Sequence, residues 1–137
     1  MVVAIIDSHP VFLNGLSEIL QHDFKGVQVI KYGNLKEFDE DKKNLNPDFI
    51  ILGVNKVFDS EELKIFKNIR QALPTAATII FFNELNMVFP FLTTGANGYL
   101  AKKSHPSELI NCMECLMAEK NYLDTQILDL ISGALHI

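Results

Sequence analysis

The length and composition of the chain restrict it to a few classes of protein. Its 137 residues are 48% apolar and 21% charged, with a formal net charge of −5. These values are typical of one globular domain and exclude a disordered or fibrous chain. The apolar runs are too short to cross a bilayer, and no basic stretch followed by an apolar one opens the chain. We therefore expect no membrane association and no secreted precursor.

Charge and cysteine content indicate the setting and the partners. Seventeen acidic residues outnumber twelve basic ones. A surface of this sign repels phosphate backbones, so we expect no direct contact between this chain and nucleic acid. The two cysteines, Cys112 and Cys115, are too few for a disulfide framework, which favours a cytoplasmic setting.

Apolar runs and helical patterns alternate along the chain. Residues 2–6 are aliphatic in succession, as expected of a strand buried on both faces, and His9-Pro10 then opens a helix. Further strands are expected at 27–32, 49–52, 78–82 and 99–101. Helical or apolar segments follow these strands near 35–45, 60–73, 87–92 and 105–118. Ser60 is the expected cap of the helix near 60–73.

Five successive strand–helix units with short connections predict the fold class. Aliphatic strands alternating with amphipathic helices indicate a parallel sheet that right-handed crossovers cover on both faces. The sequence thus predicts one doubly wound α/β domain over residues 1–123. Residues 124–137 are predicted to be a helical tail or the start of a linker, because apolar residues recur at helical spacing at Ile127, Leu130, Ile131 and Leu135.

The residues that directly follow the strands are the candidates for function. In open α/β sheets, ligands and chemistry lie outside the carboxyl ends of the strands. The residues at those ends are Asp7, Ser8 and His9, then Gly53 to Asn55, Asn83 and Glu84, and Lys102 and Lys103.

Three strings of residues carry a resemblance to a known family. Residues 5–10 (IIDSHP), 47–52 (PDFIIL) and 95–102 (GANGYLAK) resemble a response regulator receiver domain, and the likeness extends from about residue 2 to residue 123. The His-Pro pair and the GANGYLAK string are similar to the receivers that precede LuxR-type helix-turn-helix domains. The resemblance implies a flavodoxin-like (CheY-like) sheet of five strands in the order 2-1-3-4-5, flanked by five helices. It also implies two-component signal transduction, in a transcriptional regulator whose DNA-binding domain lies outside this chain.

The resemblance also implies where phosphoryl chemistry would lie. In the family, an acidic pair after the first strand holds Mg²⁺, and an Asp of the third strand accepts the phosphoryl group. A Thr or Ser after the fourth strand and a Lys after the fifth contact the phosphate. Here Asp7 and Lys102 match, but Ser8, Gly53 and Asn83 stand at the other three positions. The phosphorylation pocket is therefore expected to be degenerate.

The charges that remain at these positions do not favour a metal ion. A complete site gathers three carboxylates and one ammonium group, whereas Asp7 and Lys102 together carry no net charge. Mg²⁺ prefers octahedral oxygen ligation and gives up its waters reluctantly, and Gly53 offers no nucleophile. We therefore expect no catalytic residue, metal site or cofactor, weak or lost Mg²⁺ binding, and a protein that is neither an enzyme nor a phosphoryl acceptor.

Some residues of this region have both a functional and a structural interpretation. Asp7 with Lys102 is either the remnant of a working switch or an ion pair that neutralises a polar crevice. Tyr99 stands at the family's aromatic switch position, but Asn83 lacks the hydroxyl group with which that tyrosine is usually coupled. Cys112 lies on the apolar arc of its helix, which favours core packing over a redox or zinc site.

The apolar segment 87–92 has two interpretations. Its six residues cannot all face the sheet from one short helix, so some are expected at the surface. Met87, Phe89 and Phe91 are then candidates for an interface. Alternatively, the tail helix covers these side chains, and the sequence leaves both possibilities open.

Three functions are compatible with these residues. The first is a phosphorylation-independent receiver that binds a protein partner or forms a homodimer. The second is a small-ligand sensor, which needs a cavity beside Gly53. The third is a hydrolase with Asp7 as its nucleophile, which would need a second acid near Asp7, and residues 8–11 supply none.

Overall fold

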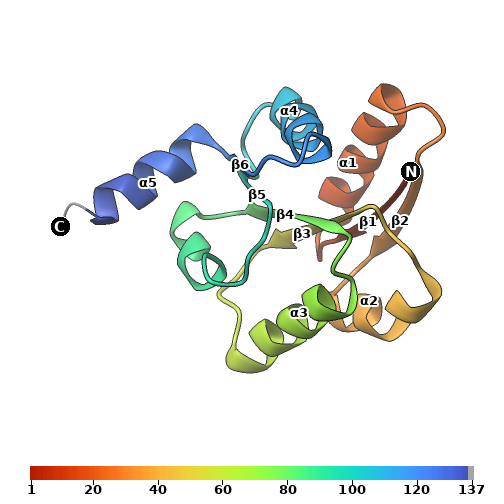
Figure 1. Ribbon diagram of the computed structural model, residues 1–137, viewed down its shortest axis with the longest axis horizontal. Helices are drawn as coiled ribbons and strands as arrows, with labels where there is room; N and C mark the ends of the chain where they lie inside the picture. The colour runs from red at the N-terminus through yellow and green to blue at the C-terminus, as the bar shows by residue number, and fades with distance from the viewer. Residues whose placement is uncertain (136–137) are drawn as a thin grey trace.

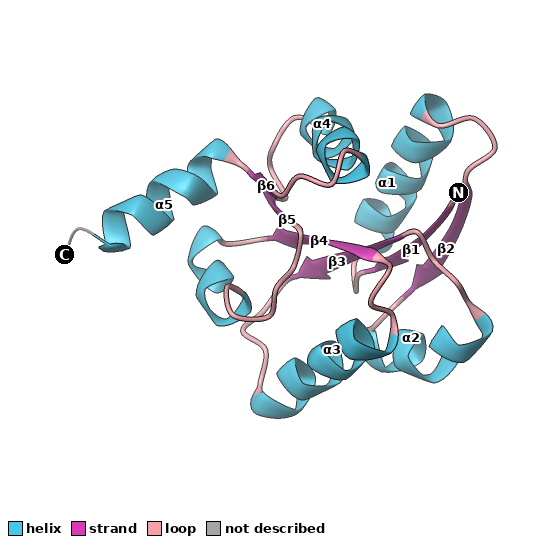
Figure 2. Ribbon diagram, viewed as in Figure 1, coloured by secondary structure: helices cyan, strands magenta, loops and turns pink. Residues whose placement is uncertain are grey.

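The computed structural model describes residues 1–135 and places six parallel strands in one sheet, in the order β2-β1-β3-β4-β5-β6 (Figure 1, Figure 2). The central strands are aliphatic and almost wholly buried, as a parallel sheet covered on both faces requires. The strands are β1 (Val2–Ile6), β2 (Gln28–Tyr32), β3 (Phe49–Val54), β4 (Ala77–Phe82), β5 (Gly98–Ala101) and β6 (Tyr122–Leu123).

Helices cover both faces of the sheet and divide the core into two layers. One layer lies under α1 (Pro10–Asp23) and α4 (Pro106–Met117), and the other lies under α2 (Leu35–Asp41), α3 (Ser60–Ala72) and the 3₁₀ helix η2 (Leu85–Phe91). A short 3₁₀ helix, η1 (Lys42–Asn44), follows α2, and α5 (Thr125–Leu135) follows β6 and extends to one side in Figure 1. None of the helices within residues 1–135 has both the length and the apolar character needed to cross a bilayer.

The predicted doubly wound α/β class is confirmed, and the five predicted strands lie in the predicted order. The count of five is wrong by one short strand, because β6 pairs in parallel with β5 and places Tyr122 opposite Gly98. Its two residues are too few to produce a periodic pattern in the sequence. The third strand also continues past its expected end at Leu52, so that Gly53 lies within β3 and pairs with Phe81 of β4.

Asp59, not the predicted Ser60, caps α3. The Asp59 carboxylate accepts a hydrogen bond from the Glu62 N–H at 2.8 Å, and the Glu62 carboxylate accepts one from the Asp59 N–H at 3.2 Å. Ser60 is the first residue of the helix. Aspartate and serine are both good helix caps, so their adjacency in the sequence leaves the choice to this reciprocal pair of hydrogen bonds.

The predicted tail is helical, and its first turn packs against the sheet domain. Asp124 is buried, and its carboxylate accepts hydrogen bonds from the Ala101 N–H at 3.4 Å and from the Ser104 hydroxyl. Ile127 is fully buried in the core layer under η2. The side chain of Leu135, which the helical spacing includes, lies outside the described residues, as do residues 136–137. The boundary at residue 123 stays a prediction.

Candidate functional site

The candidate site forms at the carboxyl edge of the sheet, from residues at the ends of β1, β3 and β5. Asp7 directly follows β1, Gly53 lies near the end of β3, and Lys102 directly follows β5. Strand-like hydrogen bonds hold the first and last of these in place: the Asp7 N–H donates to Tyr32 O at 3.0 Å, and the Lys102 N–H donates to Phe82 O at 2.9 Å. Parallel pairing therefore brings together residues that are 46 to 95 positions apart in the chain.

Asp7 and Lys102 form a buried ion pair. The Lys102 Nζ lies 2.6 Å from Asp7 Oδ2, and the side chains are 10% and 0% exposed. The ammonium group also lies 4.1 Å from the centroid of the Phe12 ring, where the electron-rich face attracts a cation. A buried carboxylate is stable only when a partner compensates its charge. Lys102 supplies that charge, so the two residues form an ion pair, one of the two interpretations that the sequence leaves open.

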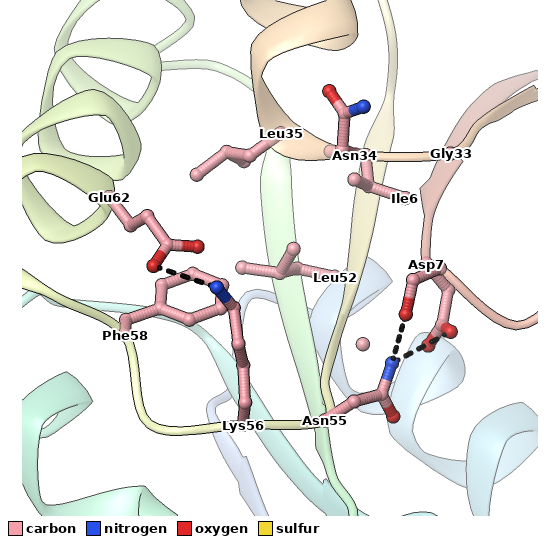
Figure 3. A pocket seen from close by; sticks show the side chains of 12 residues that line it. Ile6, Asp7, Gly33, Asn34, Leu35, Leu52, Asn55, Lys56, Phe58 and Glu62 are labelled. Carbon is pink, nitrogen blue, oxygen red and sulfur yellow. Dashed lines mark hydrogen bonds and ion pairs between the residues drawn. The ribbon is translucent and has the colours of Figure 1, made fainter.

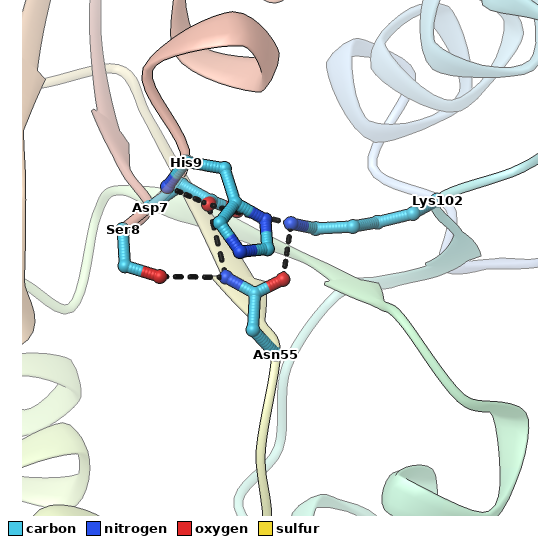
Figure 4. Close-up of polar contacts among 5 residues, drawn as sticks. All are labelled: Asp7, Ser8, His9, Asn55 and Lys102. Atoms are coloured by element: carbon cyan, nitrogen blue, oxygen red, sulfur yellow. Dashed lines mark hydrogen bonds and ion pairs between the residues drawn. The ribbon is translucent and has the colours of Figure 1, made fainter.

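Asn55 connects this pair to the rest of the site (Figure 4). Its amide nitrogen donates to Asp7 Oδ1 and to Ser8 Oγ, each at 3.0 Å, and its carbonyl oxygen accepts a hydrogen bond from Lys102 Nζ. The His9 N–H donates to Asp7 Oδ1 at 2.7 Å. The sequence places Asn55 among the candidate residues after the third strand but assigns it no role. Its position two residues after Gly53 was the available signal.

Gly53 is required by the close approach of the Asp7 carboxylate. A Cβ atom built on residue 53 would overlap Asp7 Oδ2, and it would lie 2.7 Å from Asp7 Cγ and 3.2 Å from Lys102 Cε. Carbon atoms do not approach one another or oxygen this closely without displacement. The ion pair thus occupies the volume into which any side chain at residue 53 would project.

Two of the predicted site residues lie outside this cluster. Asn83 is exposed, and its only hydrogen bond within residues 1–135 runs from its backbone N–H to Val54 O at 3.0 Å. Tyr99 is buried, its ring stacks on Phe82, and its hydroxyl donates to Phe91 O at 3.0 Å. Burial raises the pKa of the Tyr99 phenol. Within residues 1–135, no hydrogen bond therefore connects Asn83 with Tyr99.

Comparison with known proteins identifies the family to which this chain belongs. The family model of the response regulator receiver domain matches residues 3–114. This chain belongs to that family. The receiver is similar to transcriptional activator protein ExaE of Pseudomonas putida, with 25% identity over 126 residues, and to nitrate/nitrite response regulator protein NarL of Escherichia coli strain K12, with 23% identity over 135 residues. The matches cover 90% and 97% of this chain, but 58% and 62% of those proteins.

Solved structures of receivers share the fold of this chain. A LuxR-family two-component response regulator from Aurantimonas sp. SI85-9A1 superposes with a TM-score of 0.82 at 20% identity, over 99% of this chain and 98% of that one. The isolated REC domain of RcsB from Salmonella enterica serovar Typhimurium gives 0.81 at 20% identity, over 95% and 97%. The chain is thus a receiver domain of the two-component type, similar to proteins that are named as transcriptional regulators.

The residues of this receiver do not fit the Mg²⁺ ion that receivers use. Asp7 is the one carboxylate of the cluster, and both of its oxygens already face donors, Oδ1 the N–H groups of His9 and Asn55 and Oδ2 the Lys102 ammonium group. Within residues 1–135, no three His, Cys, Asp or Glu side chains gather in a way that could hold a metal ion. A cation at this edge would have to displace the Lys102 ammonium group.

The segment 87–92 turns only part of its apolar side chains outward. Phe91 is 1% exposed and Val88 is fully buried, whereas Phe89 is 40% exposed and Leu92 is 37% exposed. The prediction that Phe91 belongs to an interface is wrong, because three residues per 3₁₀ turn place Val88 and Phe91 on the same, inward side. Phe89 and Leu92 form what we call the η2 patch, whereas Met87 is half-buried and packs against the core. Both interpretations hold in part, since α5 packs against η2 and leaves this patch exposed.

Cys112 is a core residue, as its position on the helix predicts. Its side chain is fully buried on the α1–α4 side of the sheet, and burial raises the pKa of its thiol to about 12. The Sγ atom also packs directly against Gly98, where a Cβ atom would lie 2.6 Å from it. Neutral, enclosed thiols of this kind are neither nucleophiles nor metal ligands.

Proposed function

We propose that this chain is a receiver that works without phosphorylation. The observation that carries the proposal is the position of the Asp7 carboxylate, which fills the space that the side chain of a phosphoryl acceptor at residue 53 would need. Lys102 neutralises that carboxylate, so the negative charge of Asp7 is balanced without a bound metal ion. A receiver of this kind has no side chain at residue 53 to accept a phosphoryl group.

The proposed module acts through contacts with protein. The curated relatives are longer than this chain and are named as transcriptional regulators, and RcsB is described as dimers bound to DNA. We propose that this receiver belongs to a transcriptional regulator, that a second copy of the chain is its partner, and that DNA is bound by a region outside it. The hydrolase alternative gains no support, because the polar side-chain contacts of Asp7 within residues 1–135 are with His9, Asn55 and Lys102 and include no second carboxylate.

Incubation with acetyl phosphate and Mg²⁺ should leave the mass of the wild-type protein unchanged. Gly53 has no side chain to attack the phosphoryl donor, and the enclosed Asp7 carboxylate is held by three donors. Intact mass spectrometry checks this result, with a conventional receiver treated in parallel to show that the donor is active. A stoichiometric phosphoryl adduct that is stable in acid and labile in base would contradict the proposal.

Replacing Phe89 with serine should weaken self-association by roughly tenfold, since exposed aromatic side chains are frequent energetic centres of interfaces. Sedimentation equilibrium measures the dissociation constant. The matched control is Val11→Ser, which removes another exposed apolar side chain on α1, far from η2 in the sequence. Phe91→Ser is unsuitable, because that ring is part of the core. A wild-type protein that stays monomeric at high concentration would show that the η2 patch is not a dimer contact.

A further inference from the structure

A cavity of about 220 Å³ opens beside Gly53, on the α2–α3 side of the sheet (Figure 3). It lies between the carboxyl ends of β1 and β3, whose following helices α1 and α3 cover opposite faces of the sheet. In open α/β sheets this reversal point is where small ligands bind. The apolar walls of the cavity are the side chains of Ile6, Leu35, Leu52 and Phe58.

The charges that line this cavity cancel. Lys56 and Glu62 stand at its rim and form an ion pair, with Nζ and Oε1 3.4 Å apart. Asp7 is neutralised by Lys102 on the other side of β3. An ionic ligand would therefore lose its hydration without gaining an opposite charge, which is unfavourable in a largely apolar site. The lining favours an uncharged occupant.

One polar group of the lining remains available to a ligand. The Ser8 hydroxyl accepts a hydrogen bond from the Asn55 amide at 3.0 Å, and its own hydrogen has no acceptor within residues 1–135. It can thus donate to a hydroxyl or carbonyl oxygen of a molecule in the cavity. An apolar cavity of about 150 Å³ in another protein accommodates benzene, so about 220 Å³ suits one ring with a short polar substituent.

We propose that this cavity binds a small uncharged molecule of one ring, with an oxygen atom that accepts a hydrogen bond from Ser8. This proposal does not depend on the proposed phosphorylation independence. Ligand binding is tested at the cavity, whereas phosphorylation is tested by the reaction with acetyl phosphate. Each proposal can therefore fail alone. The ligand would contact α2, β3 and α3 together. It would thereby connect the Asp7–Lys102 cluster with the surface of α2 and α3.

Titration with benzyl alcohol, followed by the backbone amide signals in NMR spectra, tests this proposal. We expect saturable shifts at Ser8, Leu35 and Leu52, and no comparable shifts with benzoate or benzylamine. Leu35→Phe, which fills the cavity, should abolish binding, whereas Leu92→Phe adds the same ring to an exposed position of the η2 patch and should not.

Ser8→Ala removes the hydrogen-bond donor and leaves the apolar walls of the cavity unchanged. Ser8 is exposed, so we expect the variant to fold. It should weaken benzyl alcohol binding by about three- to tenfold, the effect of one neutral hydrogen bond, and leave toluene binding unchanged. Shifts that cluster instead on α1 and α4, equal binding of the charged probes, or unchanged binding in Leu35→Phe would each overturn the proposal.

Discussion

Replacing Lys102 with methionine is expected to lower the free energy of unfolding by about 3–5 kcal/mol. Methionine retains much of the length of the lysine chain, but it removes the ammonium group that faces Phe12 and leaves the Asp7 carboxylate buried without an opposite charge. The stability loss should therefore come from charge and not from packing. Urea denaturation at neutral pH measures it through the midpoint and slope of the transition.

The neighbouring Lys103 provides a matched control. It is exposed and forms no ion pair within residues 1–135, so Lys103→Met should change the free energy of unfolding by less than about 0.5 kcal/mol. Adding Asp7→Asn to Lys102→Met should recover most of the lost stability, because asparagine removes the uncompensated charge and still accepts the His9 and Asn55 hydrogen bonds. Equal losses in the single and double variants would attribute the effect to packing against Phe12.

The Ser8→Asp/Gly53→Asp double variant is expected to bind Mg²⁺, whereas the wild type and Gly53→Asp alone are not. The charge of the cluster falls from zero in the wild type to minus one in the single variant and minus two in the double variant. Three carboxylates then converge beside one lysine, which gives the metal ion enough oxygen ligands. Mg²⁺ at a hundred times its dissociation constant would stabilise the folded double variant by about 2.7 kcal/mol.

Without Mg²⁺, both variants should unfold more readily than the wild type. The new Cβ at residue 53 must displace the Asp7 carboxylate, and overpacking of this kind costs about 1–3 kcal/mol. In the double variant, mutual repulsion raises the pKa of at least one carboxyl group. The folded state then binds more protons than the unfolded state, so the stability of the metal-free variant should fall as the pH rises from about 4 to 7.

Thermal melting with and without millimolar Mg²⁺ checks the series. Gly53→Ala isolates the steric effect from the charge effect, and Gly15→Ala is its control, because a Cβ at Gly15 in α1 meets no atom within 4 Å. Gly53→Ala should be less stable than the wild type, while Gly15→Ala should gain about 0.5–1 kcal/mol from better helix propensity. Equal Mg²⁺ stabilisation of the wild type and the double variant would refute the charge argument.

The sequence was sufficient to predict the fold class and to show glycine where the family resemblance implies the acceptor. Aliphatic strands such as residues 2–6 and 49–52 alternate with helical patterns, and this local periodicity determines a doubly wound parallel sheet. Ser8 and Gly53 stand at two positions where the family resemblance implies carboxylates. Both conclusions depend only on residue type and on position along the chain, and the sequence gives both of these.

Local periodicity did not determine the elements with short or ambiguous patterns. Two residues, Tyr122 and Leu123, form a strand because β5 offers a free edge, and not because their own sequence requires it. Phe89 and Phe91 are equally apolar, and only the 3₁₀ geometry of η2 sends one outward and the other into the core. The capping choice between Asp59 and Ser60 likewise depended on the reciprocal bond with Glu62.

Only the tertiary structure showed which atoms occupy the space beside Gly53. The sequence gives Asp7 and Lys102 opposite charges, but their separation of 2.6 Å depends on strands β1, β3 and β5 ending at one edge of the sheet. The overlap of the Asp7 carboxylate with the Cβ position of Gly53, and the bridging by Asn55, depend on the same three-dimensional arrangement. Residue identity determines which groups are present, whereas long-range packing determines which of them occupy the same volume.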